Sequence, residues 1–171
     1  MSEATLELSG DFIKFLLSGG NAFVNPQELL EDISAEQATQ SLSDHTHTIA
    51  EVIAHLNYWQ DWFYTGAAGA AKAYPKSGDE SWPKVKSGVW DGLRADFLAQ
   101  LGRIQRLCDD GDLLRRAFTE QSNMAGGHSE RSVGQTLLYT VALHNGHHYG
   151  QIITLRQLMG LWPPQAGGII W

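Results

Sequence analysis

The sequence predicts an all-α protein, a four-helix bundle with long connections between its helices. Apolar residues recur at steps of three and four in three long stretches, which is the spacing of helices with one buried face. No stretch alternates apolar and polar residues over more than a few positions, so no strand is predicted. Connections of roughly 20 residues argue against a minimal up-down-up-down bundle and leave room for a crossover.

Length and composition are those of a single folded domain spanning residues 1–171. Hydrophobic residues make up 43% of the chain, an ordinary globular value that argues against general disorder. The net charge is -7 and no basic block is present, so a surface that binds nucleic acid is not expected. No apolar run approaches the roughly 20 residues that cross a bilayer, and the acidic N-terminus lacks a signal-peptide core. A cytoplasmic protein without membrane contact is therefore expected.

The N-terminal part of the chain predicts short helices. Residues 6–17 form an amphipathic segment that a Ser-Gly-Gly-Asn cluster ends. Asn25 is a candidate N-cap before Pro26, so a second short helix is expected over residues 26–33. Residues 34–43 are polar and predict either a connecting turn or another short helical piece.

A long helix is predicted from Thr48 to Gly66. Thr48 and Glu51 have the capping-box spacing, a hydroxyl followed three residues later by a carboxylate. His55 lies on the flank of the apolar stripe of this helix rather than on its solvated face.

Two more long helices are predicted, over residues 89–108 and from residue 132 to about residue 159. Between them lie a short helical or extended piece, 113–118, and a Gly-containing loop, 122–130. The tail, residues 161–171, is rich in Trp, Pro and Gly and is predicted to be non-helical.

The last helix carries polar residues where an inward face should be apolar. Its inward positions follow one another at steps of four and three: Leu137, Val141, His144, His148, Gln151 and Leu155. His144 and His148 lie one turn apart on the same side, a spacing that lets two imidazoles hold one metal ion. His147 points about 100° away from His148 around the helix and does not share this inward point easily.

A metal site needs a further ligand from another element, and His55 is the best candidate because it lies mid-helix beside an apolar stripe. Three histidines with one open position are the arrangement of catalytic zinc. His45, His47 and His128 are expected in loops. Cys108 is the only cysteine, so an internal disulfide and a cysteine-rich zinc site are both excluded. The alternative is that the histidines are core residues satisfied by hydrogen bonds, directly or through water.

The run from His144 to Gln151, HNGHHYGQ, resembles the HNxxHxGQ signature of the DinB / YfiT-like four-helix metalloproteins. The segment 49–55 and the tail 155–164 also resemble parts of that family, and the likeness covers residues from about 19 to 164. It implies an up-down-down-up bundle, usually a homodimer, with a divalent metal ion on His55, His144 and His148.

Relatives often place a tyrosine just before the last ligand, where this chain has His147. That leaves His147 and His148 as alternatives, and helical geometry favours His148. Imidazole suits zinc, nickel, copper and iron, and we expect zinc or nickel here.

The resemblance implies a metal-dependent enzyme, either an S-transferase that uses a low-molecular-weight thiol such as mycothiol or bacillithiol, or a hydrolase. A metal on three histidines lowers the pKa of a bound thiol or water toward neutrality. Thiol transfer needs no cysteine of the protein, whereas hydrolysis needs a general base, for which Glu51, one turn before His55, is a candidate. Two alternatives are a non-catalytic dimer of stress-response type that the metal only stabilises, and a bundle whose histidines only form hydrogen bonds.

Overall fold

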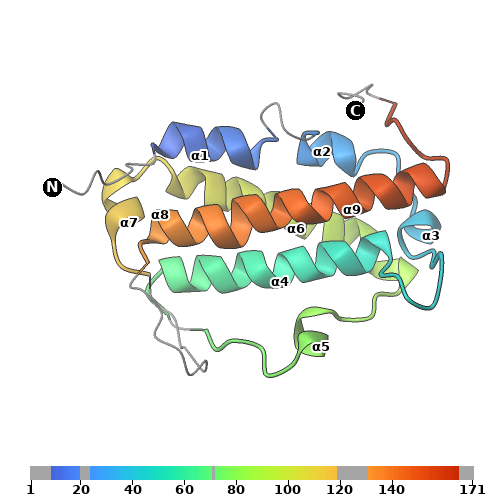
Figure 1. Ribbon diagram of the computed structural model, residues 1–171, viewed down its shortest axis with the longest axis horizontal. Coiled ribbons are helices and arrows are strands. Elements are labelled where there is room, and N and C mark those ends of the chain that lie inside the picture. Colours follow the sequence, from blue (N-terminus) through green and yellow to red (C-terminus); the bar gives the residue numbers. More distant parts are fainter. Residues whose placement is uncertain (1–8, 20–23, 71, 119–130, 166–171) are drawn as a thin grey trace, which may run out of the picture.

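A computed structural model of the chain describes residues 9–19, 24–70, 72–118 and 131–165 (Figure 1). Within these ranges the regular structure is helical, and an isolated antiparallel bridge joins Ala117 to Ser132. The predicted all-α class is therefore confirmed. No helix within these ranges is long and apolar enough to cross a membrane.

Three long helical elements form the body of the molecule. They are α4 (Ile49–Ala67), α6 (Trp90–Leu107), and a last helix made of α8 (Val133–Thr136), a π-helical segment (Leu137–Leu143) and α9 (His144–Leu158). Helix α4 packs against α6 on one side and against the last helix on the other. This arrangement buries one face of each long helix in a common core.

Helices α1 (Gly10–Leu17) and α2 (Pro26–Leu29) follow one another along the last helix (Figure 1). Helix α1 contacts the π-helical segment and α6, and α2 contacts α9. The two short helices thus cover a side of the core that α4 leaves open. The up-down-down-up order of a four-helix bundle stays a prediction.

The structure refines two local predictions and confirms a third. The first helix begins at Gly10 rather than at residue 6, because the Ser9 side chain accepts a hydrogen bond from the Phe12 N–H and caps it. Residues 34–43 contain a short helix, α3 (Ala35–Ala38), with a capping box, which decides between the two alternatives. The described part of the tail, 161–165, is non-helical as predicted.

The remaining short helices lie in the connections. They are α5 (Gly78–Ser81), a 3-10 turn (Ser87–Val89) and α7 (Gly111–Arg115). The loop that was predicted over residues 122–130 lies outside the described residues.

The start of α4 is fixed as the sequence predicts. The Thr48 hydroxyl accepts a hydrogen bond from the Glu51 N–H at 3.2 Å, and the Glu51 carboxylate accepts one from the Thr48 N–H at 3.2 Å. This reciprocal pairing satisfies two of the amide groups that a helix start leaves without partners. It also fixes the register that carries His55 two turns further along.

A buried arginine joins two segments that are far apart in the sequence. Arg156 of α9 is 1% exposed, its Nε donates to the Leu161 carbonyl at 3.0 Å, and a terminal nitrogen donates to the Leu29 carbonyl at 2.5 Å. The guanidinium also lies 5.7 Å from the ring of Trp162. Arg156 therefore ties the end of α2 and the start of the tail to the last helix.

Candidate metal centre

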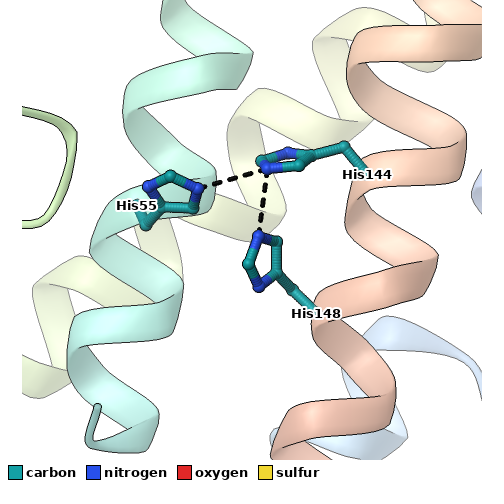
Figure 2. Close-up of side chains that lie close together, drawn as sticks. All are labelled: His55, His144 and His148. Atoms are coloured by element: carbon teal, nitrogen blue, oxygen red, sulfur yellow. Dashed lines mark hydrogen bonds between the residues drawn. The ribbon is translucent and has the colours of Figure 1, made fainter. Parts of the chain in front are cut away.

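Three imidazoles meet between α4 and the last helix (Figure 2). The Nε2 atom of His144 lies 3.2 Å from Nε2 of His55 and 3.0 Å from Nε2 of His148. His55 and His148 are each 5% exposed, and His144 is half-buried. The structure thus brings together the three histidines that the sequence proposed as ligands.

The other ring nitrogen of two of these histidines is committed to a hydrogen bond. His55 Nδ1 lies 2.8 Å from the Ser81 carbonyl, which can only accept, so this nitrogen carries the proton. His148 Nδ1 lies 2.7 Å from Oε1 of Gln151 and is the donor in the same way. In the neutral imidazoles the Nε2 atoms of His55 and His148 then present lone pairs toward His144.

Hydrogen bonding within the cluster does not satisfy these lone pairs. A neutral His144 has one N–H, which points to one neighbour at most and leaves the other lone pair unmatched. A cation placed among the three Nε2 atoms satisfies all of them at once. Tetrahedral ligands at about 2.0–2.1 Å from zinc are separated by about 3.3 Å, close to the spacings found here. The donor set therefore fits a divalent metal ion.

The protonation state of the cluster is the one that a metal ion requires. Burial lowers the pKa of His55 to about 4 and that of His144 to about 3, and it also lowers the pKa of His148. The neighbouring histidines lower these pKa values further. All three imidazoles are therefore neutral near pH 7, with lone pairs available for coordination.

A tryptophan from the connection after α4 covers the cluster. The ring of Trp82 stacks on His55 with centroids 3.8 Å apart and on His47 at the same distance, so it lies between two imidazoles. The preceding residue, Ser81, supplies the carbonyl that holds His55 Nδ1. Sequence reasoning assigned no role to Ser81 or Trp82, because neither belongs to a periodic stretch.

Comparison with known protein families identifies the family of the chain. The family model of the DinB superfamily matches residues 25–152, which contain all three clustered histidines. The chain belongs to the DinB superfamily. No curated protein and no solved structure matches it.

The other described histidines of this DinB protein do not belong to the cluster. His147 is exposed and contacts Gln151 through Nε2, at 3.3 Å from the amide nitrogen, so His148 and not His147 lies in the cluster. His45 is exposed in the loop before α4. His128 lies outside the described residues.

Gln151 corrects one detail of the predicted inward face. It is exposed rather than buried, and its amide reaches back along α9 to hold His148 and His147. A long polar side chain can do this from the flank of a helix, because residues three and four apart are neighbours on its surface. Gln151 therefore orients a ligand candidate instead of filling the core.

A π-helical segment immediately precedes His144. After this segment Asn145 is 2% exposed, while His144 faces α4. Segments of this kind are common at functional sites because they change the direction of side chains inside an otherwise regular helix. The spacing of the sequence alone predicts a regular α-helix here.

Glu51, the candidate general base, is 5% exposed and already has partners. Its carboxylate contacts the Thr48 N–H, Nζ of Lys84 at 3.1 Å and Nδ1 of His47 at 3.4 Å. Burial by itself raises the pKa of this carboxyl, but these hydrogen bonds and the Lys84 charge outweigh it and lower the pKa overall. Glu51 is therefore ionised at neutral pH, and its role as a base stays a prediction.

The single cysteine does not take part in the cluster. Cys108 follows α6, is 5% exposed, and its thiol lies 3.8 Å from the Ile104 carbonyl. Burial raises the pKa of this thiol to about 11, so it is protonated at neutral pH. This is the behaviour of a small core residue.

Proposed function

We propose that His55, His144 and His148 bind a divalent metal ion, zinc or nickel, and that the protein is a metal-dependent enzyme. The observation that carries this proposal is the meeting of three Nε2 atoms, two of them held as acceptors by Ser81 and Gln151. Membership of the DinB superfamily supports it.

When bound, such a metal ion lowers the pKa of a thiol or water that coordinates it. The residues of the chain hold and shield this position. Ser81 and Gln151 fix two imidazole rings, and Trp82 covers one side of the cluster and keeps water from it.

We favour transfer of a low-molecular-weight thiol over hydrolysis. A cavity of about 430 Å³ opens beside His55 and His144, and none of the described residues that line it carries a carboxylate. Glu51 is the candidate base for hydrolysis, but its carboxylate is engaged by Lys84 and by the start of α4. Thiol transfer requires no base from the protein and no cysteine, and it agrees with a single thiol that is buried.

A second candidate is a metal that only stabilises the fold. The cluster joins α4 to the last helix, and the Ser81 carbonyl joins the following connection to the same point. A metal ion there would act as a structural cross-link in a non-catalytic protein. A homodimer, a single domain over residues 1–171 and a cytoplasmic location stay predictions under either candidate.

Metal analysis of gently purified protein tests the site. We expect close to one divalent ion per chain, and loss of that ion in His144→Ala and in His148→Ala. His45→Ala, which changes an exposed histidine outside the cluster, is the matched control and should retain the ion. Full metal content in both cluster variants would refute the assignment of the ligands.

A cobalt-substituted sample separates the two candidate functions. A thiol that enters the coordination sphere changes the visible spectrum of cobalt, and an enzyme with an open position should show this change. A purely structural site should lose thermal stability on chelation and show no spectral response to any thiol.

A further inference from the structure

The described residues that line the cavity beside the histidine cluster are mainly aromatic or apolar. The volume of this cavity is about 430 Å³, within the range of roughly 300–1,000 Å³ that small-molecule sites occupy. The residues that line it come from α4, from the connection after α4 and from the last helix: His55, Trp59, Tyr74, Tyr139, Thr140, Leu143 and His144. None of them is an Asp, Glu, Lys or Arg.

The α4 side of this cavity is an aromatic surface held in place by its neighbours. The Trp59 ring makes edge contacts with Tyr74 at 5.5 Å, with His144 at 6.1 Å and with His55 at 6.3 Å between centroids. These ring contacts limit the freedom of Trp59 to turn. A flat group that enters the cavity therefore meets a preformed surface.

The other side consists of apolar side chains that the protein leaves open to solvent. Tyr139 is 62% exposed and Leu143 is 60% exposed, and both belong to the π-helical segment that precedes His144. Large apolar side chains beside a cluster of ligating groups indicate a surface that a ligand covers.

We propose that this cavity binds an uncharged aromatic group of the substrate and excludes anionic ones. The inference deepens the proposed function by naming the substrate class, and it rests on that function for the identity of the reacting centre. An anion would find no cation among the described residues of the lining and would enter a protein with a net charge of -7. The nearby Arg131 lies outside the lining, at 5.0 Å from the Tyr139 ring, and is exposed.

Three thiols that differ in the group attached to the sulfur test the proposal on the cobalt-loaded protein. Benzyl mercaptan, 2-mercaptoethanol and mercaptosuccinate offer an aromatic ring, a small neutral group and two carboxylates. Partial burial of the ring should lower the Kd of benzyl mercaptan about tenfold below that of 2-mercaptoethanol. Mercaptosuccinate should bind no more tightly than 2-mercaptoethanol. Equal Kd values, or tightest binding of mercaptosuccinate with loss of that binding in Arg131→Ala, would overturn the proposal.

A second readout does not depend on the metal. In metal-free protein, 4-fluorobenzyl alcohol followed by fluorine NMR should bind weakly and saturably. Tyr139→Ala and Leu143→Ala should each weaken this binding severalfold. Leu158→Ala, which removes a 70% exposed side chain outside the lining, should leave it unchanged. Equal effects in all three variants, or no binding to the wild-type protein, would count against the cavity.

These measurements separate the proposed metal-dependent function from the proposed binding of an aromatic group in the cavity. If the protein holds no metal but binds the alcohol with the expected variant pattern, the proposed function fails and the aromatic cavity stands. If it holds the metal but shows no preference among the thiols, only the cavity assignment fails.

A variant that adds a positive charge to the cavity lining should reverse the order of thiol affinities. Leu143→Arg places a cation on the lining at an exposed position, where the fold should tolerate it. This variant should keep its metal, bind mercaptosuccinate more tightly than the wild type does, and bind benzyl mercaptan less tightly. An unchanged order of affinities would contradict the role given to the lining.

Discussion

Arg156 and the histidine cluster are two buried polar sites at the last helix, and they differ in how their hydrogen bonds are satisfied. The donors of Arg156 end on the carbonyls of Leu29 and Leu161, both supplied by the protein. The Nε2 lone pairs of His55 and His148 both point toward His144, whose imidazole can donate a hydrogen bond to only one of them. The donors of the arginine are matched by acceptors within the fold, whereas the Nε2 atoms of the three histidines offer more acceptors than donors to one another.

This difference separates a structural polar group from a binding site. Both groups are almost completely buried, so burial alone would not distinguish them. The distinction lies in whether donors and acceptors match inside the chain, because an unmatched buried group is costly.

Removal of the metal should have the largest effect. At a free metal concentration of a thousand times Kd, binding stabilises the folded state by about 4 kcal/mol. Chelation should therefore lower the free energy of unfolding of the wild type by that amount, as urea denaturation would measure. His144→Ala should be insensitive to chelation. A wild type equally stable with and without chelator would mean that the cluster is satisfied without an ion.

Loss of the arginine should destabilise the protein whether or not metal is present. Arg156→Ala leaves the Leu29 and Leu161 carbonyls without their donor and creates a cavity, and we expect a loss of about 3 kcal/mol. Metal content per folded chain should not change. Arg103→Ala, at an exposed position of α6, is the matched control and should alter stability by less than about 0.5 kcal/mol.

Acid should destabilise the metal-free protein through the histidines. In the folded state the pKa of His55 is about 4 and that of His144 about 3, both below the ordinary value of 6.5. Between pH 6.5 and 4 the unfolded chain therefore binds more protons, so stability is full above pH 6.5 and falls as the pH falls through this window. We expect a loss of about 2–3 kcal/mol between pH 7 and pH 4 after allowance for solvent around the half-buried His144.

The same acid titration distinguishes the two regions. Metal-free His144→Ala should show a shallower decline, because one of the titrating groups is gone. Arg156→Ala should decline in parallel with the wild type, since a guanidinium stays protonated throughout this range. Urea unfolding at pH 7, 5.5 and 4 would measure all three slopes, and parallel slopes in every variant would rule out the cluster as their source.

The smallest expected effect comes from the group that orients His148. Gln151→Ala removes the acceptor for His148 Nδ1 and should weaken metal binding about 10–100-fold while leaving metal-free stability nearly unchanged. Gln157→Ala, at another exposed position of α9, should bind metal as the wild type does. Competition with a chromophoric chelator would measure both affinities.

The parts of the site that the sequence predicts are those that local geometry determines. The pairing of His144 with His148 follows from residues four apart on one helix, and the start of α4 follows from the capping box of Thr48 and Glu51. His55 could be proposed because a histidine beside an apolar stripe lies toward the core.

The parts that the sequence does not predict depend on contacts between distant segments. Ser81 and Trp82 reach His55 from a connection whose path is set by tertiary packing, and no periodic pattern reports it. The sequence does not predict the π-helical segment, because the steps of three and four before His144 fit a regular α-helix equally well. The same periodicity predicts an inward position for Gln151, whereas its hydrogen bonds hold it at the surface.

The burial of Cys108 has a practical consequence for assays of this protein. A buried thiol with a pKa of about 11 reacts slowly with disulfides and alkylating reagents at neutral pH. Because the chain has one cysteine, consumption of an added thiol can be followed in native protein with a sulfhydryl-specific chromogenic reagent against a low background. The same inertness means that mixed disulfides between protein and substrate will not imitate turnover.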